Sequence, residues 1–123
     1  MTWLAVGLGA AIGAWCRWQL ALRFNTVHSV LPLGTLAANL AGGYLVGVAV
    51  AVLQNHPAVP EVWRLFIITG LLGGLTTFST FSAEAMILLQ RGQYLWMIGH
   101  SAIHLFGSLL FCLAGHATVR ALN

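Results

Sequence analysis

The chain has almost no charge. Lysine and aspartate are absent from its 123 residues, and only 6% of the residues are charged: five arginines together with Glu61 and Glu84. A soluble domain carries about 25% charged residues, so this composition excludes a water-soluble globular protein. The arginines are scattered, which leaves no basic cluster to bind nucleic acid.

Reactive groups are also scarce. The two cysteines, Cys16 and Cys112, form no CxxC pair and lie in apolar segments, so we expect them to pack against neighbours rather than form a disulfide or bind a metal. The sequence contains no acid–base pair, nucleophile dyad or phosphate loop, which leaves catalysis without candidate residues. We therefore expect that the protein is not an enzyme.

Apolar residues make up 59% of the chain. A spanning helix needs ~20 mostly apolar residues to cross a hydrocarbon core of ~30 Å. Four segments meet this requirement, at about residues 3–22, 33–53, 63–89 and 94–118. They predict an all-α membrane protein with one transmembrane domain over residues 1–123, and both chain ends on the same side. No positive residue precedes the apolar start at Trp3, so we expect the first segment to be retained rather than cleaved as a signal peptide.

The arginines carry little information on orientation. Arg23 and Arg91 flank one side, with Arg17 leaning towards it, whereas Arg64 and Arg120 flank the other. The Lys/Arg bias of short loops normally sets the direction of insertion. A bias this weak fits either one orientation with a weak signal or insertion in both directions, and the second would allow an antiparallel homodimer.

The functional prediction depends on the stretch from Gly70 to Glu84 in the third segment, GLLGGLTTFSTFSAE. Its three glycines and its threonines and serines interrupt a spanning run, so we predict that the helix breaks mid-membrane. Non-helical backbone in hydrocarbon is tolerated only where it is buried in protein or lines a wet cavity. The break therefore predicts an ion site, with carbonyls for a cation and amides for an anion. Phe78 and Phe81, three residues apart, share a helical face and can turn positive ring edges to a small anion.

Other polar residues occur within the first two segments. GxxxG pairs, at Gly9 and Gly13 and at Gly43 and Gly47, predict close helix contacts. Arg17 is near enough to the membrane boundary to snorkel to the interface. Asn39 follows Thr35 by four residues, and because a buried amide in lipid needs a partner, Asn39 either bonds a neighbouring helix or lines a pore.

The fourth segment carries a polar stripe of His100, His104 and Ser108 at successive four-residue steps. The stripe predicts a hydrated track shared with Asn39. His100 and His104 also have a spacing compatible with zinc, but no carboxylate or thiolate partner is evident. Glu84 either closes an ion path or pairs with an arginine near the interface. The remaining histidines, which we expect to be solvated, are His28, His56 and His116.

Four stretches resemble the CrcB/Fluc family of fluoride channels. They are GGLTTFSTF (residues 73–81), GAAIGAWCRW (9–18), GTLAANLAGG (34–43) and HLFGS (104–108). The resemblance implies a dual-topology antiparallel homodimer with two pores in the inner membrane of a prokaryote. It also implies passive fluoride export that relieves fluoride toxicity, and a structural sodium ion at the dimer centre held by the backbone carbonyls of Gly73 and Thr76.

The same resemblance implies roles for individual side chains. The family's pore phenylalanines match Phe78 and Phe81, its pore asparagine matches Asn39, and its pore hydroxyls match Ser79 and Thr80. A vestibule serine matches Ser108, and an arginine near the aqueous vestibule matches Arg17. His100 and His104 depart from the pattern, since many relatives carry Asn, Ser or Tyr there. The alternative function is proton-coupled export of small cations, as in the small multidrug resistance type. Such an exporter would need a carboxylate in the first segment, which has none.

Overall fold

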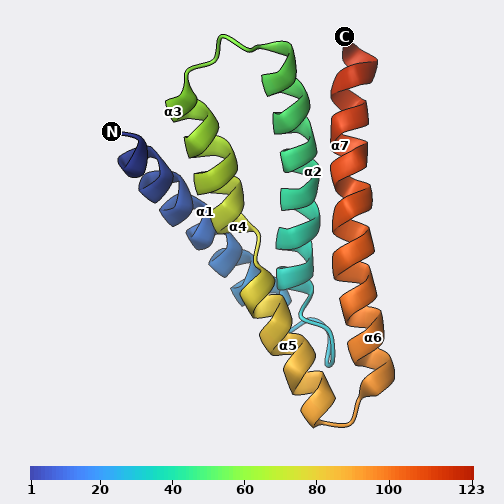
Figure 1. Ribbon diagram of the computed structural model, residues 1–123. Helices are drawn as coiled ribbons and strands as arrows, with labels where there is room; N and C mark the ends of the chain where they lie inside the picture. The colour runs from blue at the N-terminus through green and yellow to red at the C-terminus, as the bar shows by residue number, and fades with distance from the viewer.

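The computed structural model describes residues 1–123 and is entirely helices and connecting turns, which confirms the all-α prediction (Figure 1). The first two segments are α1 (Thr2–Phe24) and α2 (Leu33–Asn55). The third comprises α3 (Glu61–Arg64), the π-helical η1 (Leu65–Leu72), α4 (Gly73–Leu75) and α5 (Phe78–Gln90). The fourth comprises α6 (Tyr94–Ala102), the π-helical η2 (Ile103–Gly107) and α7 (Ser108–Leu122). Both termini lie towards the end of the molecule that carries the α2–α3 connection (Figure 1).

Three helical stretches are long and apolar enough to cross a membrane: Leu33–Asn55, Glu61–Gln90 and Tyr94–Leu122. Helix α1 has the same length as α2, 23 residues, but Arg17 and its tryptophans make it less apolar. A fourth span through α1 stays a prediction. Only 16 of the 123 residues are buried, and most large apolar side chains face outwards. Such a surface suits a chain whose surroundings are lipid, because apolar side chains need not be withdrawn from hydrocarbon.

The helices pack as two close pairs. Helix α2 runs alongside α7, and α1 crosses η1 and α4 (Figure 1). At Gly13 an added Cβ would collide with the backbone of Leu71 and Leu75, and at Gly47 it would collide with the backbone of Cys112. Both positions belong to GxxxG pairs, so the predicted close contacts of the first two segments are confirmed.

The third segment is broken, as predicted, and the non-helical residues are Thr76 and Thr77. Both have extended backbone, with ψ of 156° at Thr76 and 122° at Thr77. The hydroxyl of Thr77 accepts a hydrogen bond from the amide of Thr80 at 3.0 Å and caps α5. Threonine is a favoured N-cap because its side chain replaces a missing backbone acceptor. The chain therefore stops one helix and starts the next within two residues.

Candidate functional site

Asn39 stabilises the break in the third segment by hydrogen-bonding both the amide and the carbonyl of Thr77. Its Oδ1 accepts from the Thr77 amide at 2.7 Å, and its Nδ2 donates to the Thr77 carbonyl at 3.0 Å. Asn39 is 8% exposed and lies in the N-terminal third of α2, opposite the break. Each unpaired backbone group in hydrocarbon would cost several kcal/mol, so this pairing is what makes the interruption tolerable. Asn39 thus makes the helix-to-helix bond considered from the sequence, and it also lines a cavity.

The carbonyls of Gly73 and Thr76 are among those at the break that have lost their regular partners. In an α-helix the carbonyl of residue i accepts from the amide of residue i+4. The amide of Thr77 donates to Asn39 instead of Gly73, and the amide of Thr80 donates to the Thr77 hydroxyl instead of Thr76. The oxygens of Gly73 and Thr76 are therefore available as hard ligands of the kind that small cations prefer. These residues fit the sodium site that the family resemblance implies.

Arg17 contacts the carbonyl between those two. Its Nε donates to the Gly74 oxygen at 3.2 Å, and the side chain is partly buried. In a continuous helix that oxygen would accept from the amide of Phe78. Arg17 therefore turns towards the break instead of extending to the interface as a snorkelling arginine would.

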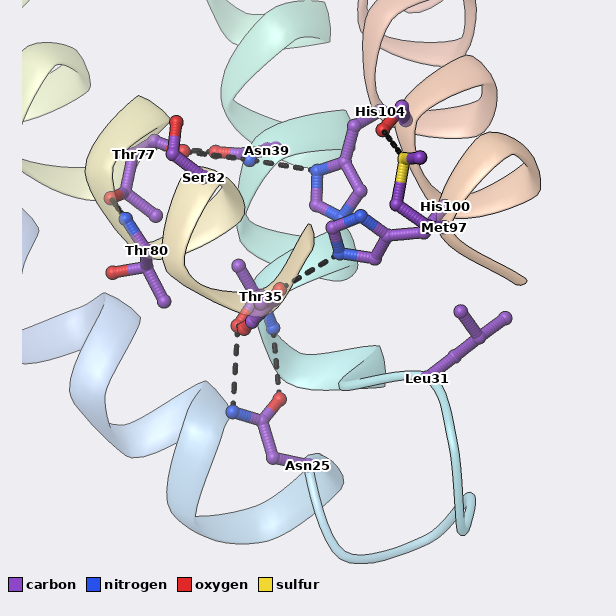
Figure 2. Close-up of polar contacts among 12 residues, drawn as sticks. Asn25, Leu31, Thr35, Asn39, Thr77, Thr80, Ser82, Met97, His100 and His104 are labelled. Atoms are coloured by element: carbon purple, nitrogen blue, oxygen red, sulfur yellow. Dashed lines mark hydrogen bonds and ion pairs between the residues drawn. The ribbon is translucent and has the colours of Figure 1, made fainter. Parts of the chain in front are cut away.

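Asn39 also contacts His104 of the fourth segment, whose ring lies beside that of His100. Its Nδ2 lies 3.0 Å from His104 Nδ1, and His100 Nε2 lies 3.0 Å from Glu84 Oε2 (Figure 2). The rings of His100 and His104 are 4.5 Å apart between centroids, and both side chains are buried, at 1% and 5% exposed. Glu84 thus pairs with a histidine and not with an arginine. This is also the carboxylate partner that the sequence did not reveal, since the three residues offer ligand atoms within 4.8 Å of one another.

The polar line continues from Glu84 to the α1–α2 connection. The hydroxyl of Thr35 donates to Glu84 Oε1. Asn25, at the end of α1, accepts from the Thr35 amide at 3.0 Å and donates to the Thr35 hydroxyl at 3.4 Å (Figure 2). Side chains from α2, α5, α6 and η2, together with that of Asn25 directly after α1, therefore form one line from the break to the far end of the molecule.

Phenylalanine rings lie along this line. Phe81 stacks on His100 with centroids 5.2 Å apart and an interplanar angle of 3°, and it lies 5.1 Å from the ring of His104. Phe78 is tilted against Phe81 at 5.3 Å but is 79% exposed. The two rings share a helical face as expected from their spacing, yet only Phe81 is partly buried within the chain.

A cavity lies at each end of the polar line. The larger, about 300 Å³, adjoins the break. The predicted site residues among those lining it are Asn39, Thr76, Phe78, Phe81, His104 and Ser108. The smaller, about 220 Å³, is lined by residues that include Asn25, His28, Glu84 and Arg91. The buried pair of His100 and His104 lies between Glu84 and the larger cavity, so the polar line joins the two spaces.

Some predicted residues lie outside these cavities. Ser79 is exposed and its hydroxyl lies 3.3 Å from that of Thr77, and neither Ser79 nor Thr80 lines the larger cavity. The prediction that His28 is merely solvated is wrong. Its Nδ1 accepts from the amides of Val30 and Leu31 at 3.1 and 3.0 Å and organises the α1–α2 connection.

Sequence reasoning assigned no role to Thr77, Thr35 or Asn25. Thr77 had a usable signal, because a threonine after a glycine-rich stretch and before an apolar helix is a typical N-cap. The contact of Thr35 with Glu84 joins residues 49 apart in the chain, and no local pattern marks such a pair.

Residues 4–116 match the family model described as "CrcB-like protein, Camphor Resistance (CrcB)". The chain belongs to the CrcB family. A protein of Cupriavidus metallidurans named "Fluoride-specific ion channel FluC" is 53% identical to this CrcB-family chain over 122 residues, covering 99% of the chain and 97% of the relative. Proteins of the same name from Cupriavidus pinatubonensis and Pseudomonas putida are 56% and 53% identical, covering 97% and 94% of this chain and 94% and 91% of their own lengths. These bacterial relatives and the apolar helices together identify a multi-pass prokaryotic membrane protein.

Proposed function

We propose that this CrcB-family chain is a fluoride-specific ion channel that lets fluoride leave the cytoplasm passively and so relieves its toxicity. The observation that carries the proposal is the buried polar line between two cavities, running through a membrane-type chain (Figure 2). Its relatives at more than half identity are named as fluoride-specific channels. It is not an enzyme, in keeping with the channel names of those relatives.

The chemistry of the line suits a small, strongly hydrated anion. A selective pore replaces the hydration shell of its ion with groups held in a narrow passage. Asn39 and the histidines supply polar groups, and Phe81 supplies a ring beside them. The positive edge of an aromatic ring attracts anions. Larger halides would be excluded by the width of the passage.

The functional unit in this proposal is an antiparallel homodimer in the inner membrane, with α1 as the fourth span. The near-even distribution of arginines on the two sides permits insertion in both directions. Phe78 is 79% exposed beside the larger cavity in the single chain, and a second copy would cover it. The carbonyls of Gly73 and Thr76 from both copies would hold one sodium ion, whose charge raises the local potential for anions in both pores.

A proton-coupled exporter of small cations is the weaker alternative. Such a carrier needs a membrane-embedded carboxylate to exchange protons for the substrate, and α1 contains none. The one intramembrane carboxylate, Glu84, is already bonded to Thr35 and His100. The position and the bonds of Glu84 therefore do not support a proton-coupled cation carrier.

The deciding experiment is ion efflux from liposomes that contain the purified protein. We expect a fluoride gradient to dissipate and a chloride gradient of the same size to persist. Ser82→Ala is a matched control, because Ser82 is exposed and bonds only the Phe78 carbonyl, and it should conduct like the wild type. Equal fluxes of the two halides would remove the selectivity claim, and no fluoride flux would remove the function.

Topology is tested separately with a reporter fused to the C-terminus. A dual-topology chain gives reporter activity on both sides of the membrane. Activity on one side alone would reject the antiparallel dimer while leaving the efflux result intact.

A further inference from the structure

Two histidine nitrogens on the polar line are buried without a hydrogen-bond partner. They are His100 Nδ1 and His104 Nε2. Buried polar groups are nearly always paired, because an unpaired one bears its full desolvation cost. The lack of a partner at each of these two nitrogens therefore needs an explanation. The neighbouring groups determine which of the two nitrogens carries a proton.

The orientation of the Asn39 amide is fixed by Thr77. The Thr77 amide can only donate and the Thr77 carbonyl can only accept. Asn39 must therefore place Oδ1 towards the amide and Nδ2 towards the carbonyl, as observed. Exchanging the two atoms would oppose a donor to a donor and an acceptor to an acceptor. The second hydrogen on Asn39 Nδ2 then points to His104 Nδ1 at 3.0 Å.

This arrangement selects the tautomer of His104. Because Asn39 Nδ2 donates, His104 Nδ1 must be the acceptor, and a neutral imidazole carries its one proton on the other nitrogen. The result is a buried Nε2–H with no protein acceptor, on a side chain that lines the larger cavity. On the other ring, Nε2 donates to the Glu84 carboxylate, which leaves His100 Nδ1 as an unoccupied acceptor.

We propose that His104 offers its Nε2–H to fluoride as a hydrogen-bond donor and that Asn39 is the positioning residue that fixes this tautomer. The inference rests on the proposed function and names the donor atom within it. The donor is free because its buried nitrogen has no protein acceptor, and the side chain that carries it lines the larger cavity. The tautomer is fixed because the backbone of Thr77 orients the Asn39 amide. The interruption of the third segment thereby determines, through Asn39, which ring nitrogen of His104 in the fourth segment carries the proton.

The same tautomer argues against a metal ion bound by Glu84, His100 and His104. A neutral imidazole ligand binds through a nitrogen lone pair. On His104 the lone pair of Nδ1 faces Asn39, and Nε2 carries the proton. Moving the proton to Nδ1 would oppose it to the Asn39 amide hydrogens.

The first test replaces His104 by two residues of similar length. Glutamine places an amide nitrogen near the position of Nε2 and can still donate, whereas methionine cannot. We expect His104→Met to lower fluoride flux in liposomes about 10–100-fold, the equivalent of a lost hydrogen bond to a charged group. His104→Gln should recover most of that loss. Equal flux in the two variants would overturn the donor role.

The second test reads the tautomer directly. Solid-state NMR of protein in lipid, with ¹⁵N-labelled histidine, distinguishes protonated from unprotonated ring nitrogens, and the His104 signals are those that disappear in His104→Gln. We expect Nε2–H in the wild type. In Asn39→Asp a carboxylate oxygen replaces Nδ2 and accepts from His104, so the proton should move to Nδ1. A wild-type Nδ1–H would overturn the inference even if fluoride flux were normal.

The third test separates the tautomer from the added charge of the aspartate. Asn39→Asp should lower fluoride flux strongly with His104 present, but by less in the His104→Gln background, where no tautomer can change. An equal loss in both backgrounds would show that the Asp charge alone is responsible and would overturn the positioning role of Asn39. Absence of flux in the wild type, in contrast, would count against the proposed function and not against the tautomer.

Discussion

The third and fourth segments line the same route in different ways. The third interrupts its backbone at Thr76 and Thr77, so its contribution comes from main-chain groups at the break. The fourth stays helical and contributes the buried side chains of His100 and His104. The unpaired backbone groups of the broken segment need partners from another helix. The backbone of the unbroken segment stays helical there, so its polar contribution comes from buried side chains. Asn39 of α2 connects the two, because it bonds to both.

The segments also share a feature. Each contains π-helical turns next to its functional residues, η1 ahead of the break and η2 at His104. Such turns are rare and occur frequently at functional sites, where they release backbone groups or redirect side chains. The third segment therefore leaves regular α-helical geometry ahead of the larger cavity and again at Thr76 and Thr77, and the fourth leaves it at His104, which lines that cavity.

Removing the connection between the two segments should have the largest effect. Asn39→Leu leaves the amide and the carbonyl of Thr77 unpaired, at about 1–3 kcal/mol each. We expect fluoride flux to fall about 100-fold or more, with a lower thermal unfolding temperature in detergent. Flux within twofold of the wild type would show that the break stabilises itself.

Changing the ring that lies against the fourth segment should have the next largest effect. Phe81→Ile removes aromatic contacts with His100 and His104, each worth about 0.5–1.5 kcal/mol beyond its buried area. We expect fluoride flux to fall about tenfold while the protein remains folded. Phe78→Ile sharpens the comparison, since Phe78 contacts neither histidine within the chain. If Phe78→Ile reduces flux as much, its partner must come from a second copy.

The arginine at the break should matter less than the asparagine. Arg17→Gln loses the charged donor to the Gly74 carbonyl, and a hydrogen bond of this type is worth about 1.5–3 kcal/mol when buried and less where water reaches it. We expect a fall in fluoride flux of a few fold, measured in the same liposomes. Arg17→Lys keeps the charge without the guanidinium geometry, so full recovery by lysine would assign the effect to charge alone.

The smallest effect should come from the connection that borders the second cavity. His28→Phe keeps a ring against Trp96, 5.6 Å away, but removes the acceptor for the amides of Val30 and Leu31. We expect a loss of about 1–2 kcal/mol in the free energy of unfolding and faster proteolysis between α1 and α2. Unchanged proteolysis would show that the amides find water instead.

Local sequence patterns predict much of this arrangement. The apolar runs predict the helices closely, and the glycines and hydroxyl residues predict an interruption in the third segment. The sequence predicts a break between Gly70 and Glu84 without fixing its residues, and in the structure α4 includes Gly73 and ends at Leu75. Glycine lowers helix stability but does not end a helix by itself. The end is set where Thr77 can cap α5 and Asn39 can receive its amide.

Other parts depend on contacts between distant residues. Glu84 allowed either an ion path or an arginine partner, and its partners are Thr35 and His100, which come from two other helices. The position of Arg17 in the sequence allows its side chain to extend to the membrane interface, yet its Nε donates to the nearby Gly74 carbonyl. In both cases the sequence indicates a polar group that needs a partner, while the choice of partner depends on helix packing.

The π-helical stretch η2 places one more residue between His100 and α7 than a regular α-helix would. A π-turn contains one residue more than an α-turn, and each residue of an α-helix advances it by about 100°. Deleting one residue between Ile103 and Gly107 would convert this turn into an ordinary α-turn, so α7 should keep its orientation and Gly115 its close approach to the carbonyl of Tyr44. A one-residue deletion in α7 itself has no extra residue to absorb it and should rotate the following turns away from α2 by about 100°.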